Sequence, residues 1–310
     1  MRSWVMLVFI HSLNTLVNSR KLTTEENERN SKKCGVQFLS GNTKEKRLAK
    51  RSTGGRKFER NEYPWTVLLH WRGGSCSGVQ ISPRHILTAA HCVVETIGDD
   101  HRSEGSDRVV STMREPEDIS VYIGEKEPNS NDSIHCLDID DIYKITKITA
   151  HTYEPSPIER DIALIELSVN ISEEVSTPIC MPNEELSFDS VLFATGSGRD
   201  STIPVTLDGP SNDCLVQRVV AQKYASVNET RHEIETITFA RSTCEGDSGG
   251  PVFQVDEDGR HILVGLTSWG PECEKHTNIN MFSYNVDVRA YVDWVCKYSG
   301  VCPIEERKDR

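Results

Sequence analysis

The chain has 310 residues, enough for one large or two modest domains, and its 36% apolar and 26% charged residues are typical of a folded soluble protein. Its net charge of −12 at pH 7 and its sequence pI of about 5.4 argue against a nucleic-acid backbone or an anionic membrane surface as the main partner. The acidic balance says little more about function.

The first 19 residues have the pattern of a secretory signal peptide. Arg2 supplies a positive charge, residues 4–13 form an apolar core, and Val17 and Ser19 offer small side chains for cleavage. The alternatives are a membrane anchor or a buried first element, but this apolar run is too short to span a bilayer and no other run is long enough. We therefore expect a secreted, extracellular protein without a membrane span.

Residues 20–51 are rich in Lys, Arg, Glu, Asn and Ser, with Cys34 in the middle. Such a segment cannot bury much apolar surface, so we expect a propeptide that is extended or tethered rather than a domain. The basic pair Lys50 and Arg51, followed by Ser52, predicts processing after Arg51, and a solvated basic loop is the alternative.

From Tyr63 onward, short apolar and β-branched runs alternate with Gly, Pro, Asn and Asp, which is typical of an all-β barrel or sandwich. We interpret residues 99–118 as a long surface loop. Near the end, Asp287 is positioned to cap a helix with Val288, Val292 and Val295 on one side, and a charged tail follows. The predicted strands cover residues 65–71, 79–81, 86–88, 119–123, 142–148, 162–167, 191–195, 215–220, 252–255, 262–268 and 281–286.

Ten cysteines behind a signal peptide indicate disulfides rather than metal ligands or redox thiols. No Cys-x-x-Cys pair or paired-histidine motif suggests zinc, and we expect neither a metal nor another cofactor. Three sequons, at Asn131, Asn170 and Asn228, predict glycosylation of a secreted surface.

The stretch 243–251 places Ser248 between glycines on a tight turn. The backbone N–H groups of Ser248 and Gly246 can then point at a neighbouring oxyanion, which is the chemistry of acyl transfer. An ordinary glycine-rich turn is the alternative, so the chain must also supply a base and an acid. His91 at the end of an apolar run and Asp161 just before another run are candidates, although each signal is weak alone.

In the order His91, Asp161 and Ser248, these motifs resemble those of the chymotrypsin-like serine protease family, from about Ser52 to Tyr298. Further matches lie at residues 63–65, 195–198 and 268–270. The resemblance implies two packed antiparallel six-stranded β-barrels with a C-terminal helix, a protease domain over residues 52–302 and a tail over residues 303–310. The runs 22–34 and 81–88 are also similar to a group of secreted trypsin-like proteins of nematodes.

The resemblance implies a role for each of these residues. Ser248 would be the nucleophile, His91 the general base and later acid, and Asp161 the group that fixes the His91 tautomer. A serine hydroxyl is a poor nucleophile near neutral pH, so it needs an adjacent imidazole whose charged form a carboxylate stabilises. Gly246 and Ser248 would form the oxyanion hole, where one donor is worth on the order of 3 kcal/mol.

The family's substrate pocket falls on Ser242 at the floor, on Ser268, Trp269 and Gly270, and on an opposite wall near Asn280. A trypsin-like floor would carry a carboxylate, whereas Ser242 is similar to the chymotrypsin type. We therefore expect a preference for an uncharged apolar or aromatic side chain before the scissile bond.

In the family, cleavage frees an apolar N-terminus whose amine pairs with the aspartate before the nucleophile, here Asp247. Cleavage after Arg51 would present Ser52, a small polar residue whose burial contributes about 1.5 to 3 kcal/mol less than that of an aliphatic residue. The resemblance pairs Cys76 with Cys92, Cys244 with Cys273, and Cys34 with Cys180, so that a cleaved propeptide stays attached. Cys136, Cys214, Cys296 and Cys302 are left with three open connectivities.

The leading hypothesis is a secreted, monomeric serine endopeptidase that hydrolyses extracellular proteins or peptides through an acyl-enzyme, with protease inhibitors as further partners. The alternative is a weakly active or inactive protease homologue with a binding or regulatory role, which the Ser52 terminus favours. A disulfide-rich adhesion module is a weaker alternative, because it gives no reason for the ordered His91, Asp161 and Ser248 motifs.

Overall fold

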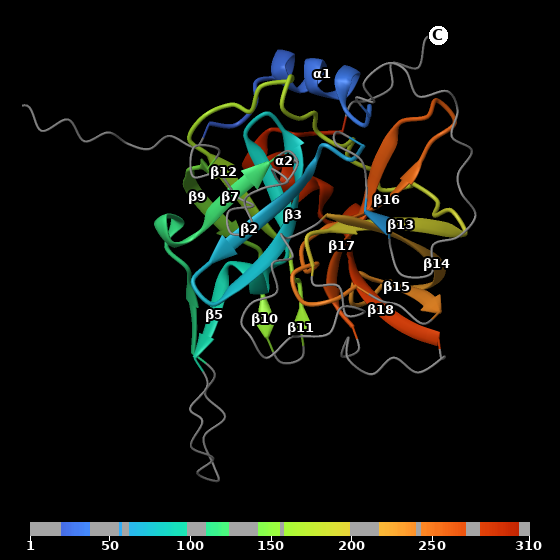
Figure 1. Ribbon diagram of the computed structural model, residues 1–310. Coiled ribbons are helices and arrows are strands. Elements are labelled where there is room, and N and C mark those ends of the chain that lie inside the picture. The colour runs from blue at the N-terminus through green and yellow to red at the C-terminus, as the bar shows by residue number, and fades with distance from the viewer. Residues whose placement is uncertain are drawn as a thin grey trace, which may run out of the picture.

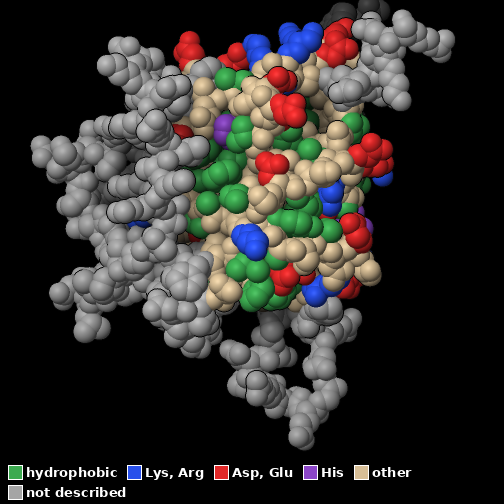
Figure 2. Space-filling model, turned by 90° about the vertical axis from the view of Figure 1, so that its right-hand side faces the viewer, with side chains coloured by type: hydrophobic (Ala, Val, Ile, Leu, Met, Phe, Trp, Pro, Cys, Tyr) green, Lys and Arg blue, Asp and Glu red, His purple; other side chains and the backbone are tan. Residues whose placement is uncertain are grey.

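The computed structural model describes residues 20–37, 56–57, 62–97, 110–123, 142–155, 158–198, 217–239, 243–270 and 280–303, and the statements below concern these. Two β-sheet halves lie side by side, with the N-terminal half on the left and the C-terminal half on the right in Figure 1. On the face seen in Figure 2, acidic and basic side chains are interspersed rather than gathered by sign. No described helix has both the length and the apolar character needed to cross a bilayer.

The N-terminal half is a curled antiparallel sheet of seven strands in the order β8-β7-β2-β3-β4-β12-β9. Its inward side chains, among them Val67, Leu69, Ile86 and Ile165, are buried in one apolar cluster. The strands are β2 (Thr66–Trp71), β3 (Gly74–Ser82), β4 (His85–Thr88), β7 (Ser120–Ile123), β8 (Ile142–Tyr143), β9 (Ile145–Ala150) and β12 (Ala163–Leu167).

The C-terminal half closes on itself, because β14 pairs with both β13 and β15. The closed barrel runs β14-β13-β16-β17-β18-β15, and the short strand β1 (Arg56–Lys57) adds to the outer edge of β14. The barrel strands are β13 (Val191–Gly196), β14 (Arg218–Asn228), β15 (Glu233–Phe239), β16 (Pro251–Val255), β17 (His261–Trp269) and β18 (Asn280–Asp287).

The predicted all-β fold is confirmed, and each predicted strand coincides with or overlaps an observed one. The two halves differ, however: one barrel is closed, whereas the other is a half-barrel sheet that stays open within the described residues. The hairpin of β14 and β15 was largely missed, because β14 is long, polar and mostly half-buried or exposed. Two further strand pairs form separate two-stranded sheets: β5 (Val94–Ile97) with β6 (Val110–Met113), and β10 (Glu154–Pro155) with β11 (Ile158–Glu159). β6 and a short 3₁₀ helix (Pro116–Asp118) lie within the interval predicted as a loop.

The C-terminal helix forms where the sequence predicts it. The Asp287 side chain accepts from Arg289 N at 3.1 Å and begins a 3₁₀ turn (Val288–Tyr291) that continues as α2 (Val292–Ser299). Gly300 ends the helix with a φ of 75°, and a Cβ on it would lie 2.6 Å from Leu22 N. The Cys296–Cys302 disulfide links α2 to the chain that follows it. It pairs two of the four cysteines whose partners the sequence leaves open.

The N-terminal segment was expected to be extended or tethered. Its described part is tethered by the Cys34–Cys180 disulfide, but it is not extended, because Thr24–Lys33 form helix α1. A capping box begins it: Glu26 N donates to Thr23 Oγ1 at 3.2 Å, and Thr23 N donates to Glu26 Oε2 at 2.9 Å. The helix lies across the top of the N-terminal half in Figure 1. The polar composition of this segment gave no helical pattern of apolar residues, because the helix docks through specific polar contacts rather than through a broad apolar face.

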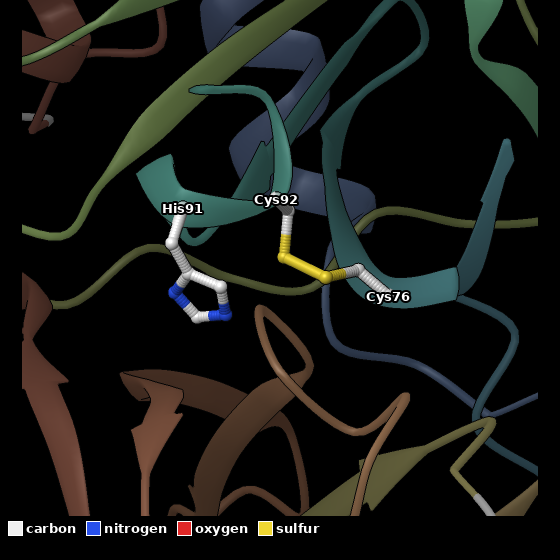
Figure 3. Close-up of side chains that lie close together, drawn as sticks. All are labelled: Cys76, His91 and Cys92. Atoms are coloured by element: carbon white, nitrogen blue, oxygen red, sulfur yellow. A yellow bond between two sulfur atoms is a disulfide. The ribbon is translucent and has the colours of Figure 1, made fainter. Parts of the chain in front are cut away.

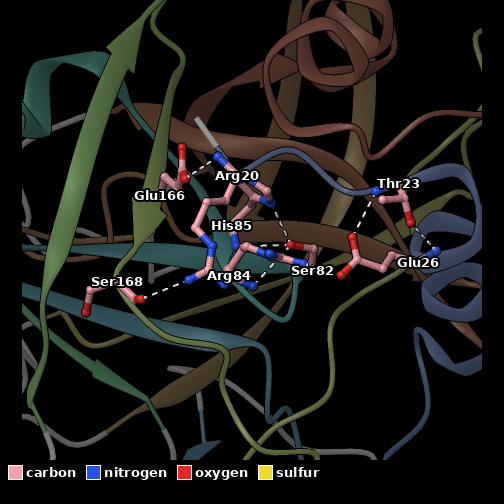
Figure 4. Close-up of polar contacts among 8 residues, drawn as sticks. All are labelled: Arg20, Thr23, Glu26, Ser82, Arg84, His85, Glu166 and Ser168. Carbon is pink, nitrogen blue, oxygen red and sulfur yellow. Dashed lines mark hydrogen bonds and ion pairs between the residues drawn. The ribbon is translucent and has the colours of Figure 1, made fainter. Parts of the chain in front are cut away.

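Those contacts reach residues distant in the sequence. Leu22 is buried and its N–H donates to Ser299 O at 2.7 Å, while the Asn27 side chain makes two hydrogen bonds to the backbone of Cys302. Arg84, 6% exposed, pairs with Glu26 at 2.6 Å (Figure 4). The Cys34–Cys180 disulfide lies at the end of the helix. Residues 20–37 are thus an integral part of the fold.

Beneath α1, the His85 imidazole is fully buried, and its Nδ1 lies 2.8 Å from Ser82 Oγ (Figure 4). The Ser82 oxygen already accepts from the N–H groups of Arg84 and His85, so its proton is left for Nδ1 and the ring is neutral. Burial first, and then the Arg84 charge, lower the pKa of His85 to about 3, against a small opposing effect of Glu26.

This shift predicts a pH-dependent stability. Below pH ~6.5 the unfolded chain takes up a proton on His85 that the native protein refuses until about pH 3, so this group lowers the unfolding free energy by roughly 1.4 kcal/mol per pH unit across that window. Urea unfolding of His85→Gln from pH 7 to pH 4 should therefore show a flatter pH dependence than the parent protein. His70→Gln, at an exposed position, is the control. Parallel curves for parent and His85→Gln would contradict the prediction.

Candidate active site

His91 and Asp161 meet because their strands are neighbours. His91 lies in a 3₁₀ turn (Ala90–Cys92) that follows β4, and Asp161 lies two residues before β12, which pairs with β4 through Ala163 and Thr88. His91 Nδ1 is 2.8 Å from Asp161 Oδ2, and His91 N donates to Asp161 Oδ1 at 2.9 Å. The carboxylate therefore holds both the ring and the backbone of the histidine.

A third donor reaches the same carboxylate from the other half of the molecule. Ser268 on β17 donates its hydroxyl to Asp161 Oδ2 at 2.6 Å. The sequence places Ser268 in the substrate pocket by resemblance and does not reveal this contact, which depends on how the two sheets pack. Ser268 is thus a positioning residue for the aspartate.

The electrostatics of the pair favour its charged form. Burial opposes the charge on each group, yet the His91 charge and hydrogen bonds, together with the Ser268 hydroxyl, hold the pKa of Asp161 below its usual value. Likewise burial would lower the pKa of His91, but the Asp161 charge and hydrogen bond raise it. Asp161 is 2% exposed, so its charge acts on the imidazole through little solvent. With Nδ1–H directed at Asp161, Nε2 is left as the proton acceptor.

The Ser248 turn packs against the end of β4 that carries His91. Ser77 N donates to Ser248 O at 2.8 Å, and that oxygen lies 3.7 Å from Cys92 Sγ. Gly249 has a φ of 78°, and a Cβ there would lie 2.7 Å from Ala89 N, so only glycine permits this approach. Within the described residues the Ser248 hydroxyl has no hydrogen-bond partner, and its role as nucleophile stays a prediction.

The backbone around Ser248 offers two N–H donors. Gly246, with a φ of 95°, has its carbonyl fixed by Ser77 Oγ at 2.8 Å. Among the described residues, no acceptor is bound by the N–H of Gly246 or of Ser248. Two unpaired N–H groups on one turn can receive a negatively charged oxygen.

Asp247 anchors this turn from behind. Its carboxylate accepts from Gly198 N at 2.8 Å and from Cys244 N at 2.9 Å. Burial raises the pKa of Asp247 to about 6, against the lowering effect of these two N–H groups and of the Arg218 charge. The group therefore carries a large desolvation cost that a nearby positive charge would relieve. Arg51 and Ser52, the residues of the predicted activation step, lie outside the described residues.

The pocket is described only in part, because Ser242 and Cys273 lie outside the described residues. The Trp269 indole donates to Glu233 at 3.0 Å and stacks on Tyr284 with ring centroids 3.8 Å apart. A Cβ on Gly270 would lie 3.7 Å from Ser283 Oγ, whereas Asn280 is exposed and pairs with Phe239. The side chain of β18 that faces Gly270 is therefore that of Ser283. Sequence reasoning missed this residue, because its position depends on the register of the strand.

Cys76, His91 and Cys92 place potential metal-ligand atoms within 4.8 Å of one another. Figure 3 shows the two sulfur atoms bonded to each other beside the imidazole. A disulfide offers no thiolate, so this group does not fit a metal ion. The structure also contains the Cys34–Cys180 bridge, and Cys244 is disulfide-bonded to a residue outside the described set. Cys136, Cys214 and the sequon at Asn131 lie outside it too.

Comparison with known proteins identifies the family. The trypsin family matches residues 52–295. Mannan-binding lectin serine protease 1 of Mus musculus is 24% identical over 282 residues, which are 86% of this chain and 37% of that protein. Serine protease filzig of Drosophila melanogaster is 28% identical over 242 residues (72% and 13%), and the proclotting enzyme of Tachypleus tridentatus is 26% identical over 272 residues (80% and 66%). The chain thus spans less than two thirds of each relative, but the family match covers most of the chain itself: it belongs to the trypsin family.

Proposed function

We propose that the protein is a secreted serine endopeptidase that cleaves peptide bonds of extracellular proteins. The observation that carries the proposal is the Asp161 carboxylate, which accepts from His91 Nδ1, His91 N and Ser268 Oγ directly beside the Ser248 turn. Such an arrangement stabilises an imidazolium, which is what a general base becomes when it takes a proton from serine. Membership of the trypsin family supports the same chemistry.

In the proposed reaction, His91 Nε2 takes the proton of Ser248 Oγ while that oxygen bonds to the scissile carbonyl carbon. The carbonyl oxygen becomes negative and is held by the N–H groups of Gly246 and Ser248. His91 then gives the proton to the leaving amine as the C–N bond breaks. A water molecule, deprotonated by His91, hydrolyses the resulting acyl-enzyme and regenerates the Ser248 hydroxyl.

We further propose that the pocket takes an uncharged apolar or aromatic side chain before the cut, on the strength of Ser242. Activation would follow cleavage after Arg51, with the Ser52 amine adding a positive charge that relieves the burial of Asp247. Residues 20–37 would remain attached through the Cys34–Cys180 bridge. The enzyme would act as a monomer and bind protease inhibitors outside the cell. It would carry glycans at Asn131, Asn170 and Asn228. It would belong to the group of secreted trypsin-like proteins of nematodes that residues 22–34 suggest.

A second candidate function is a binding or regulatory homologue with little activity. It is favoured by the polar Ser52 and by Asp247, whose two oxygens already accept backbone N–H groups. A phosphonate probe for activated serines separates the two functions when applied before and after cleavage at Arg51. Labelling at Ser248 after cleavage supports the endopeptidase, and folded protein that stays unlabelled in both forms supports the homologue. A peptide library that shows preference for Arg or Lys before the cut would overturn the specificity proposal.

A further inference from the structure

A cavity of about 260 Å³ lies between α1 and the N-terminal half of the molecule. Its volume approaches the lower end of the ~300–1,000 Å³ typical of small-molecule sites. Apolar surface in its lining comes from Leu22, Pro83, Ile171 and Pro178. Because α1 forms part of the wall, whatever fills this space touches both the N-terminal segment and the protease domain.

Two buried polar side chains in the cavity wall each have a nitrogen or oxygen atom without a hydrogen-bond partner among the described residues. The Ser176 hydroxyl has one proton, which it donates to Pro64 O at 2.6 Å, and its oxygen also contacts one end of the Gln80 amide. The other end of that amide has no hydrogen-bond partner among the described residues. Gln80 is 0% exposed. Arg84 pairs with Glu26 through Nη2, but its Nε has no partner among the described residues. Buried polar groups without partners are costly, which indicates an occupant that can hydrogen-bond.

The rim of the same cavity includes Asn170, the acceptor of a predicted glycosylation sequon. Asn170 is exposed, while the next residue is fixed by a hydrogen bond from Ile171 N to Pro83 O at 2.7 Å. The first sugar of a glycan on Asn170 would therefore start at the mouth of the cavity.

We propose that the cavity holds the first N-acetylglucosamine of an N-linked glycan on Asn170, and that this sugar holds α1 on the protease domain. The hydroxyl and acetamido groups both donate and accept, so they suit the Gln80 amide and Arg84 Nε, while the sugar's C–H faces suit Leu22 and Ile171. The inference rests on the proposed secretion, because N-glycans are added in that pathway. It does not depend on catalysis.

The sugar would add to contacts that already hold the helix. Asn30 Nδ2 donates to Ile81 O at 2.9 Å, and Lys33 pairs with Glu173 at 2.7 Å across an exposed edge. An exposed ion pair of this kind contributes little stability. A bound sugar ring would supply hydrogen-bond partners to Arg84 Nε and to the unpaired end of the Gln80 amide, and so stabilise the docked helix.

The experiment uses full-length protein secreted by eukaryotic cells, with mass spectrometry first reporting the occupancy of Asn170 and Asn228. Hydrogen exchange in α1 is then compared among the intact glycoprotein, protein trimmed by an endoglycosidase to one N-acetylglucosamine, and Asn170→Gln. The proposal expects α1 amides to exchange on the order of tenfold faster in Asn170→Gln and unchanged in the trimmed form, with amides of β12 unaffected. Asn228→Gln is the matched control and should leave α1 unchanged.

Three results would overturn the proposal. The first is that Asn170 carries no glycan while Asn228 carries one. The second is that the α1 amides exchange at the same rate in all forms. The third is that their protection is lost on trimming to the single sugar, which would assign the protection to the outer glycan. Phosphonate labelling of Ser248 on the same samples, before and after cleavage at Arg51, reports the enzyme proposal separately. No labelling in either form, together with the predicted exchange pattern, would contradict the protease proposal alone. Labelling without that exchange pattern would contradict the glycan site alone.

Discussion

Asp161→Asn should lower kcat for peptide hydrolysis by about 10⁴-fold, with little change in KM, as in the triads of related enzymes. The carboxylate receives three donors, from His91 Nδ1, His91 N and Ser268 Oγ, and an amide group can accept them at only one of its two ends. Its NH₂ end would face a donor and drive the imidazole into the wrong tautomer. Steady-state kinetics on a chromogenic peptide amide measure the loss.

Asp118→Asn is the control for this variant, since Asp118 is exposed and far from the site in sequence. Ser248→Ala sets the background rate of a protein that cannot form the acyl-enzyme. If Asp161→Asn kept activity within tenfold of the parent, another group would have to orient His91, and the assignment of Asp161 would be wrong.

Gly198→Ala should lower kcat by about 10²- to 10³-fold, the loss expected when an oxyanion donor is misplaced. A Cβ on Gly198 would lie 2.5 Å from both carboxylate oxygens of Asp247, closer than real Cβ atoms approach. The aspartate must then leave the Gly198 and Cys244 N–H groups, and the adjoining turn of Gly246 and Ser248 moves with it. Kinetics combined with circular dichroism distinguish this local change from unfolding.

Val191→Ala, at an exposed position in β13, the strand that precedes Gly198, is the matched control for Gly198→Ala. The two catalytic variants also differ from each other: Gly198→Ala leaves the His91 and Asp161 pair in place, so the pH profile of its residual activity should match that of the parent. Full activity in Gly198→Ala would show that the Asp247 anchor does not set the geometry of the oxyanion donors.

The strands and the approximate positions of the three reactive residues were readable from the sequence because they depend on short patterns. Short, nearly continuous apolar runs mark β2 and β12, and glycine beside Ser248 marks a turn that no other residue allows. The all-β fold was therefore predictable, although the difference between a closed and an open half was not, since closure depends on the pairing of β14 with β15.

Contacts between distant segments could not be read in this way. The hydroxyl of Ser268 reaches Asp161 across 107 residues, and Ser283 faces Gly270 only because of the register of β18. Helix α1 was missed for a different reason. Thr23 and Glu26 have the spacing of a capping box, a local signal that the polar composition of the segment outweighed.

The docking of Asn27 onto Cys302 has a consequence for biosynthesis. These residues are 275 positions apart, and at ~5–20 residues per second a ribosome takes roughly 14 to 55 s to pass from one to the other. Residues 20–37 therefore emerge long before the backbone groups of Ser299 and Cys302 that receive them. During that interval the segment can form its local hydrogen bonds, such as those between Thr23 and Glu26, and its attachment to the domain is a late event of folding.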